Sequence, residues 1–362
     1  MRRRHFIAAA GVGAAASTLA APAVAQDIRQ WRMVSAWPRN LPGPGVAAQM
    51  LADRIGALSG GRIEVELFAA GEIVPGPGVF DAVGEGTAEL YHAVPAYWGS
   101  KSRGILLFGS QPFGLLATEQ VGWLEHGGGQ ELYDEIYARF DLKPFLCGNS
   151  GPQRAGWFRS EIATVDDLRG LRYRTTGLNS EMCSRLGMAV QAMSGPEMFQ
   201  ALQSGALDAG EFIGPWSDSA LGLHQVAPYY YWPGIGEPSS AEECAINLDV
   251  WNDLPDDLQA AVAFACESLY NPVLTEYHTN HARALRELVA EHGVEVRELP
   301  EEVMVAMGNA MGEVMGELRE DSDELVRRIT ESFVEYRALM DGYMRHADAG
   351  QLNARALDYD FG

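Results

Sequence analysis

The first third of the chain alternates between strand-like and helix-like patterns. Residues 28–36 predict a strand, and a Pro/Gly turn leads from them into a predicted helix over 46–60. At 63–68 apolar and polar residues alternate with a period of two, which indicates a half-buried strand. A helix at about 78–85 and a strand near 88–93 follow. The order β-α-β-α-β predicts an α/β fold with a mostly parallel sheet covered by helices.

The helix-to-strand pattern recurs later in the chain. Residues 80–93 and 199–212 align without a gap, with Phe, Ala and Gly at matching positions. Each copy is a helix closed by a glycine, Gly86 or Gly205, and then a short strand. Because another strand is predicted upstream of the second copy, at 171–174, we expect two related α/β lobes. Ligands of such folds bind in the cleft at the carboxyl ends of the strands, and hinge motion closes over them.

The pattern becomes helical after about residue 250. A long helical segment begins near Leu254, and more helix follows over about 301–346 after a short break. One face of the last helix carries apolar residues at spacings of three and four, namely Leu325, Ile329, Phe333, Tyr336, Met340 and Tyr343. This stripe predicts packing either on the chain's own lobes or on a second copy, in a dimer.

The N-terminal residues predict export. Residues 1–25 have a basic start, an Ala/Gly-rich centre and a small-residue site at Ala23 to Ala25, as secretory signal peptides do. The Arg3-Arg4 pair resembles a twin-arginine signal, and an ordinary Sec signal is the alternative. The predicted organisation has four parts: a signal peptide (1–25), a first α/β lobe with part of the hinge (26–150), a second α/β lobe (151–245), and a helical region that braces the lobes or forms a dimerisation arm (246–362).

Charge and cysteine spacing exclude several classes of function. The 362 residues carry a formal net charge of −22, which argues against nucleic acid or an anionic membrane as a partner, because no basic surface could displace the counterions. The four cysteines, Cys147, Cys183, Cys244 and Cys266, fit no zinc pattern. An exported protein could form disulfides, and small buried thiols are the alternative.

One motif suggests an enzyme. Residues 43–48 match G-x-G-x-x-A between a predicted strand and helix, and Glu66 lies about 20 residues on, as in dinucleotide-binding folds. Pro44, however, removes a backbone N–H that a pyrophosphate would need, and a helix start with turn glycines is the favoured explanation of the motif. An exported oxidoreductase with a nicotinamide cofactor is therefore the alternative function.

Three polar positions predict a site for an anion and a cation. Arg174 ends a predicted strand, where its planar fork can bind a carboxylate through two hydrogen bonds, unless it is an ordinary surface arginine. Glu211 ends the matching strand of the second repeat, and Gln153 lies in a polar turn at the crossover between lobes. A ligand carboxylate facing Glu211 would be repelled, and a sodium or calcium ion held by oxygen atoms would remove that cost. The alternative is that Glu211 pairs directly with Arg174 or Arg154 and no metal is present.

The segment 210–237 is rich in aromatic residues, Gly and Pro and has no Lys or Arg, as expected for a rigid cleft wall. Four segments of the chain resemble the substrate-binding proteins of tripartite ATP-independent periplasmic (TRAP) transporters. They are residues 148–158, 171–182, 196–218 and 222–234. The branch that they most resemble binds 2-oxo acids, lactate and related monocarboxylates with a metal ion.

This resemblance implies a two-lobed periplasmic binding protein with a hinge and bracing C-terminal helices, rather than an enzyme. The protein would capture a small organic anion in the periplasm, use no organic cofactor, and deliver the anion to TRAP membrane subunits. In this branch a C-terminal helix can exchange between subunits to make a homodimer.

The resemblance also implies roles for eight residues around one ligand. These are Arg174 as the carboxylate anchor, Tyr97 as a hydrogen-bond donor to it, Gln153 and Glu211 as side-chain metal ligands, Phe212 as a backbone metal ligand, Glu237 as a further polar group, and Trp37 and Trp216 as walls.

Two positions depart from the family pattern. Phe212 stands where the branch commonly has Trp, so the pocket wall loses an indole although a backbone ligand survives. Arg154 follows Gln153, where a neutral residue is more usual. If Arg154 faces the cleft, we expect a ligand that is larger or carries a second acidic group.

Overall fold

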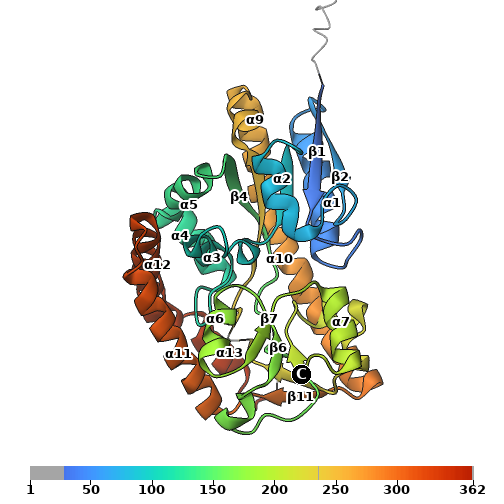
Figure 1. The fold of residues 1–362 in the computed structure, drawn as a ribbon, viewed down its shortest axis with the longest axis vertical. Coiled ribbons are helices and arrows are strands. Elements are labelled where there is room, and N and C mark those ends of the chain that lie inside the picture. The colour runs from blue at the N-terminus through green and yellow to red at the C-terminus, as the bar shows by residue number, and fades with distance from the viewer. Residues whose placement is uncertain (1–27, 235, 361–362) are drawn as a thin grey trace, which may run out of the picture.

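Two sheets form the two lobes of the molecule, one above the other in Figure 1. The computed structural model describes residues 28–234 and 236–360, so the predicted signal peptide lies outside the described residues. The first sheet has the strand order β2 (Ile63–Phe68), β1 (Arg29–Ser35), β3 (Leu90–Ala93), β10 (Ala241–Asn247) and β4 (Leu142–Asn149). The second has the order β11 (Glu295–Glu298), β9 (Tyr229–Trp232), β5 (Gly156–Phe158), β8 (Ala209–Gly210), β6 (Arg172–Arg174) and β7 (Ala189–Gln191).

The predicted β-α-β-α-β order of the first lobe is confirmed. Strand β1 pairs in parallel with both β2 and β3, and the connecting helices are α1 (Pro44–Leu58) and α2 (Val79–Gly84). Three further helices cover this lobe: α3 (Leu106–Gly109), α4 (Ala117–His126) and α5 (Gly129–Ala138). The second lobe carries α6 (Gly177–Arg185), α7 (Gly195–Ser204) and α8 (Pro215–Leu221).

The repeat seen in the sequence has a structural counterpart. Gly86 follows α2 and Gly205 follows α7, with φ of 77° and 76°, a conformation that glycine adopts without strain. In each copy a short strand then enters the sheet, β3 in the first lobe and β8 in the second. The two glycines therefore turn the chain from helix to strand in the same way in both lobes.

Two strands lie in a different sheet from their neighbours in the sequence. β10 pairs antiparallel with β3 and β4 of the first sheet, although residues 241–245 fall in the range predicted for the second lobe. β11 pairs with β9 of the second sheet, although it lies in the predicted helical region. We therefore propose lobe boundaries that assign β10 to the first lobe and β11 to the second.

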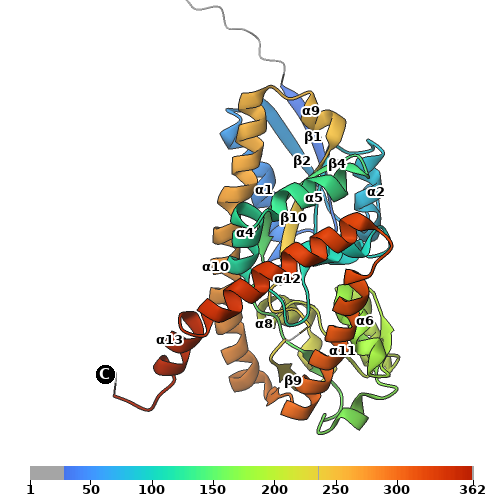
Figure 2. The same ribbon diagram turned by 90° about the vertical axis from the view of Figure 1, so that its left-hand side faces the viewer.

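Long helices connect the lobes, as expected. After the short α9 (Leu248–Asn252), the 37-residue α10 (Asp256–His292) runs past both lobes and packs on β4, α1 and α8 (Figure 2). α11 (Glu301–Arg319) packs on α6, and α12 (Glu324–Met344) packs on α4 and α5. None of the described helices is both long and apolar enough to cross a membrane.

The apolar stripe of α12 divides into two parts. Leu325, Ile329 and Phe333 are buried in the core of the first lobe. Farther along, Tyr343 is 65% exposed, and α12 leads into α13 (Asp348–Arg355), which projects away from the body in Figure 2. The stripe thus packs on its own lobe over its first turns and leaves the distal end uncovered.

The core of the first lobe contains a buried carboxylate. Glu243 on β10 is fully buried and accepts hydrogen bonds from the hydroxyls of Tyr91, Tyr133 and Tyr137 and from the indole of Trp98. Burial raises the pKa of Glu243, and these four donors oppose the shift. The carboxylate therefore gathers four aromatic side chains from three elements around β10.

All four cysteines are buried free thiols. The structure therefore favours the alternative of small buried side chains over disulfides.

We expect Glu243→Leu to lower the free energy of unfolding by at least about 3 kcal/mol, because it leaves four buried donors without their acceptor. Urea unfolding of the purified protein measures the change, with the exposed Glu331→Gln as control. A loss below about 1 kcal/mol would show that the aromatic residues repack around leucine without this carboxylate.

Candidate functional site

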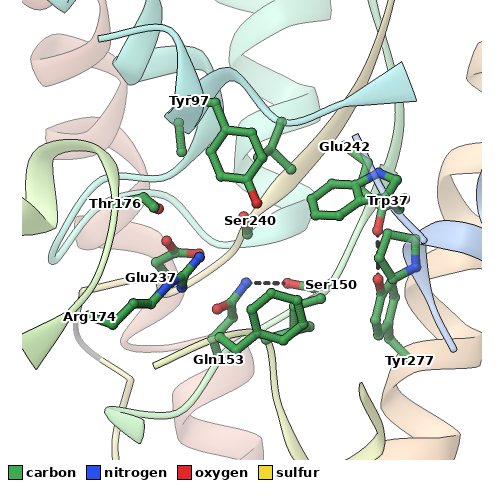
Figure 3. Close-up of a pocket in the computed structure, with 15 residues that line it drawn as sticks. Trp37, Tyr97, Ser150, Gln153, Arg174, Thr176, Glu237, Ser240, Glu242 and Tyr277 are labelled. Carbon is green, nitrogen blue, oxygen red and sulfur yellow. Dashed lines mark hydrogen bonds between the residues drawn. The ribbon is translucent and has the colours of Figure 1, made fainter. Parts of the chain in front are cut away.

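A cavity with an empty volume of about 400 Å³ lies between the lobes (Figure 3). Six of the eight predicted site residues line it, namely Trp37, Tyr97, Gln153, Arg174, Phe212 and Glu237. They come from the loop after β1, a turn after β3, the crossover after β4, and the carboxyl ends of β6 and β8, together with the segment before β10. The carboxyl ends of strands from both sheets thus meet at one cavity, as the sequence predicts.

Arg174 is buried at the cavity wall with only 2% of its surface exposed. Its Nε donates to the carbonyl oxygen of Met193 at 2.9 Å, and its Nη1 donates to the carbonyl oxygen of Glu211 at 2.6 Å. Nη1 also lies 3.2 Å from Oε1 of Glu211, and the guanidinium stands over the ring of Phe212 at 5.4 Å. The direct Arg174–Glu211 ion pair, one of the two alternatives from the sequence, is therefore present, and the guanidinium is held by fixed main-chain acceptors.

Two buried glutamates share this single arginine. Glu211 lines a second cavity, which adjoins the first, rather than the first itself. Burial raises the pKa of Glu211 to about 7 against the opposing effect of Arg174. Glu237 lines both cavities, and burial together with the charge of Glu211 raises its pKa well above the usual range. The site therefore holds two buried acids beside Arg174, and burial opposes the ionisation of both.

Both predicted side-chain metal ligands have a buried oxygen atom without a hydrogen-bond donor. The amide Nε2 of Gln153 donates to Ser150 Oγ at 3.1 Å, whereas Gln153 Oε1 and Glu211 Oε2 make no hydrogen bond within the described chain. Unpaired buried oxygen atoms are costly, and amide and carboxylate oxygens are the ligands that hard cations prefer. Residues 28–234 and 236–360 contain no cluster of three His, Cys, Asp or Glu suited to a metal. The donors present fit a sodium or calcium ion that also uses amide and main-chain oxygens.

The aromatic residues of the cavity wall pack on one another and on Trp216. Trp37 packs on Tyr97 with ring centroids 5.8 Å apart, and burial raises the pKa of Tyr97 to about 12. Trp216 is not among the lining residues: its ring packs edge-on against Tyr277, at 5.8 Å, and Tyr277 lines the cavity. Trp216 thus supports the wall from behind.

Arg154 lies away from the main cavity. It stands over the ring of Tyr230 at 5.9 Å and lines a neighbouring groove and the second cavity. Arg154 therefore does not contribute to the wall of the main cavity.

The G-x-G-x-x-A motif is a helix start beside the cavity. Gly43, with φ of 89°, precedes α1, and Pro44 is the first residue of that helix. A Cβ on Gly43 would lie only 2.4 Å from the Tyr277 hydroxyl, so glycine is needed for this close approach. The structure therefore supports a helix start, rather than a dinucleotide site, as the explanation of the motif.

Sequence reasoning missed five polar lining residues, namely Ser150, Thr176, Ser240, Glu242 and Tyr277. The acidic pair Glu242-Glu243 in an otherwise apolar strand was an available signal, since burial of adjacent acids needs a reason. Tyr277 gave no such signal, because its helix α10 was expected only to brace the lobes.

The chain is similar to known proteins over most of its length. Residues 34–321 match the family described as bacterial extracellular solute-binding protein, family 7. A monocarboxylate 2-oxoacid-binding periplasmic protein of Nostoc sp. strain PCC 7120 is 38% identical over 84% of this chain and 86% of its own.

Solved structures agree with this assignment. A TRAP transporter solute-binding protein of Bordetella bronchiseptica RB50, described as a mixed-occupancy dimer with copurified calcium and picolinate, superimposes with a TM-score of 0.88 at 34% identity, over 91% of this chain and 97% of that one. A TRAP periplasmic solute-binding protein of Pseudoalteromonas atlantica T6c with bound sodium and pyruvate gives 0.87 at 31% identity, over 91% and 100%. One from Colwellia psychrerythraea with calcium and pyruvate gives 0.87 at 30%, over 90% and 99%. The chain therefore belongs to the family 7 solute-binding proteins, the non-enzymatic periplasmic receptors of TRAP transporters.

Proposed function

We propose that this receptor captures a short monocarboxylate, most simply a 2-oxo acid such as pyruvate, together with a sodium or calcium ion. The observation that carries the proposal is the buried Arg174 at the wall of a small cavity. The other residues that line this cavity include acidic and apolar side chains but no second Arg or Lys. The relatives described with sodium or calcium and pyruvate, and the 2-oxoacid-binding relative, support the same ligand class. The loaded receptor then delivers the anion to TRAP membrane subunits.

The residues of the site divide the task between the two ions. Nε and Nη1 of Arg174 already donate to main-chain oxygens, so Nη2 is the guanidinium nitrogen that would reach the ligand carboxylate, and Tyr97 also lines the cavity as a hydroxyl donor. Gln153 Oε1, Glu211 Oε2 and the carbonyl oxygen of Phe212 would hold the cation. The bound cation supplies positive charge that offsets the repulsion between Glu211 and the incoming carboxylate.

An oxidoreductase has no remaining support. The family is one of solute receptors, and the glycine motif that suggested a nicotinamide site is explained by the approach of Gly43 to Tyr277.

We expect Arg174→Lys to weaken binding of pyruvate at least tenfold without loss of fold, because lysine keeps the charge but its single ammonium cannot bind the ligand carboxylate while it also replaces the guanidinium's hydrogen bonds to Met193 and Glu211. Calorimetric titration of both proteins measures it. Arg172→Lys is a matched control, since Arg172 lies two residues away but pairs with Asp208 near the surface. An affinity within about threefold of wild type would mean that Arg174 is not the anchor.

We expect Glu211→Gln to lose metal binding and ligand affinity together, because it removes one charged metal ligand and keeps the shape. Whatever free energy the cation adds to ligand binding, the ligand must add to cation binding. Pyruvate is titrated into metal-stripped protein, and the titration is repeated after sodium or calcium is restored, for wild type, the variant and the exposed control Glu161→Gln. Equal wild-type affinity in both titrations would discard the cation and leave Glu211 as the ion-pair partner of Arg174 alone.

We also propose that the receptor forms a homodimer through the distal end of α12 and α13. Leu339 and Tyr343 on α12 and Leu352 on α13 are 69%, 65% and 57% exposed, and such apolar surface favours a partner. The Bordetella bronchiseptica relative described as a dimer supports this assembly.

Deletion of residues 339–362 should convert a dimer into a folded monomer, because it removes the exposed end of the stripe and keeps the buried first turns of α12. Light scattering gives the mass of each protein, and thermal unfolding shows whether the shortened chain is still folded. A monomeric full-length protein would refute the proposed dimer.

A further inference from the structure

A row of buried polar contacts stands behind one wall of the cavity. It consists of Trp37, His92, Glu242 and Tyr277, and we call these four residues the Trp37 anchor. In Figure 3 Trp37, Glu242 and Tyr277 lie on the side of the cavity away from Arg174. None of the roles predicted for the site uses His92 or Glu242.

The contacts run from the wall into the core of the first lobe. The indole Nε1 of Trp37 donates to Nδ1 of His92 at 3.0 Å. His92 is 0% exposed on the central strand β3, and its Nε2 lies 3.4 Å from Oε2 of Glu242 on the adjacent β10. That contact is too poorly aligned for a hydrogen bond, and neither atom makes another within the described residues. The hydroxyl of Tyr277 donates to Oε1 of Glu242 at 2.7 Å.

The hydrogen bond to His92 fixes which surface Trp37 presents to a ligand. An indole nitrogen can only donate, so Nδ1 of His92 must accept, and in the neutral ring the proton lies on Nε2, facing Glu242. Because the only polar atom of the Trp37 side chain is used in this way, the part that lines the cavity offers carbon atoms alone. Packing against Tyr97 restrains the same ring from another direction.

Apolar side chains also line the cavity around Trp37, next to the hydrogen-bonded pair of Glu242 and Tyr277. Val94, Ala96 and Ile213 line it together with Trp37. A ligand whose carboxylate is bound by Arg174 must place its other end among these side chains. Burial of a methyl group there is favourable, whereas a longer chain requires Trp37 to move away from its hydrogen bond with His92.

We propose that His92 is a positioning residue: by holding Trp37 as a fixed end wall, it restricts the receptor to monocarboxylates with a short apolar end. This inference rests on the proposed function and narrows its ligand class. His92 does not touch the ligand; it acts through the orientation of the indole.

The test is a chain-length profile measured by calorimetry. Dissociation constants are determined for pyruvate and for its straight-chain homologue of six carbons, with sodium and calcium present. For each protein the readout is the ratio of the six-carbon to the three-carbon constant. Discrimination of roughly 10- to 200-fold can follow from a misfit of about one methylene in an apolar pocket. We expect His92→Phe, which removes the acceptor, and Trp37→Phe, which removes the donor, each to lower the ratio by about tenfold or more.

A double-mutant cycle separates positioning from a general structural effect. If His92 acts through the indole, adding His92→Phe to Trp37→Phe should not lower the ratio further. His92→Asn keeps an acceptor oxygen near the place of Nδ1 and should retain most of the wild-type ratio. Trp123→Phe is the matched control, because it loses an equal 3.0 Å indole hydrogen bond, to Ser332, away from the cavity, and should leave the ratio unchanged.

Two results would overturn the inference: a wild-type ratio in folded His92→Phe, or a further fall when His92→Phe is added to Trp37→Phe. If His92→Phe does not fold, the comparison of Trp37→Phe with His92→Asn takes its place. Equal six-carbon to three-carbon ratios in these two variants would overturn the inference. Wild-type protein that binds none of the 2-oxo acids would refute the proposed function, and with it the inference. If the wild-type protein binds pyruvate and the variants have the wild-type ratio, the inference about His92 is refuted and the proposed function stands.

Discussion

The ion pair between Arg174 and Glu211 is the interaction on which the cleft depends. Both side chains are almost completely buried, and removing two charges from water is costly unless hydrogen bonds and further charges compensate. Main-chain carbonyls of Met193 and Glu211 supply part of that compensation. Burial and the charge of Glu211 raise the pKa of the second buried acid, Glu237, well above its usual value, which favours its protonated form. A site with one arginine and two glutamates can accept an anion only if a cation or a proton comes with it.

Strand β10 connects this site to the rest of the first lobe. The register of its pairing with β4 shifts between the adjacent residues Glu242 and Glu243, and their side chains reach different surroundings. Glu242 reaches Tyr277 and His92 at the cavity wall, and Glu243 gathers four aromatic donors in the core. Helix α10 carries Tyr277 past both sheets. The cavity wall is thereby held by the most buried part of the molecule rather than by surface loops.

Much of the candidate site was predictable because it lies at strand ends. Arg174 follows directly from the β-α-β pattern, which places a residue at the carboxyl end of β6 in the cleft, whereas Phe212 was expected only from the family resemblance. Glu242, His92 and Tyr277 were not predictable in this way. Their roles depend on the antiparallel return of β10 between β3 and β4, and no local pattern specifies which sheet a returning strand will join. Trp216 was expected to form part of the cavity wall and does not line it. An aromatic residue in a cleft segment can equally pack behind a wall, as Trp216 does on Tyr277.

The sequence by itself determined the elements, the two-lobed α/β class, the paired helix-to-strand turns at Gly86 and Gly205, and the residue types that an anion and a cation require. These features depend on the periodicity of side chains and on the conformational freedom of glycine, which are properties of short segments. Only the tertiary structure decided that Arg174 contacts Glu211 directly, that Arg154 lies away from the main cavity, and which half of the α12 stripe is buried. Such contacts join residues far apart in the chain, and their energies depend on burial and distance, which exist only once both lobes are assembled.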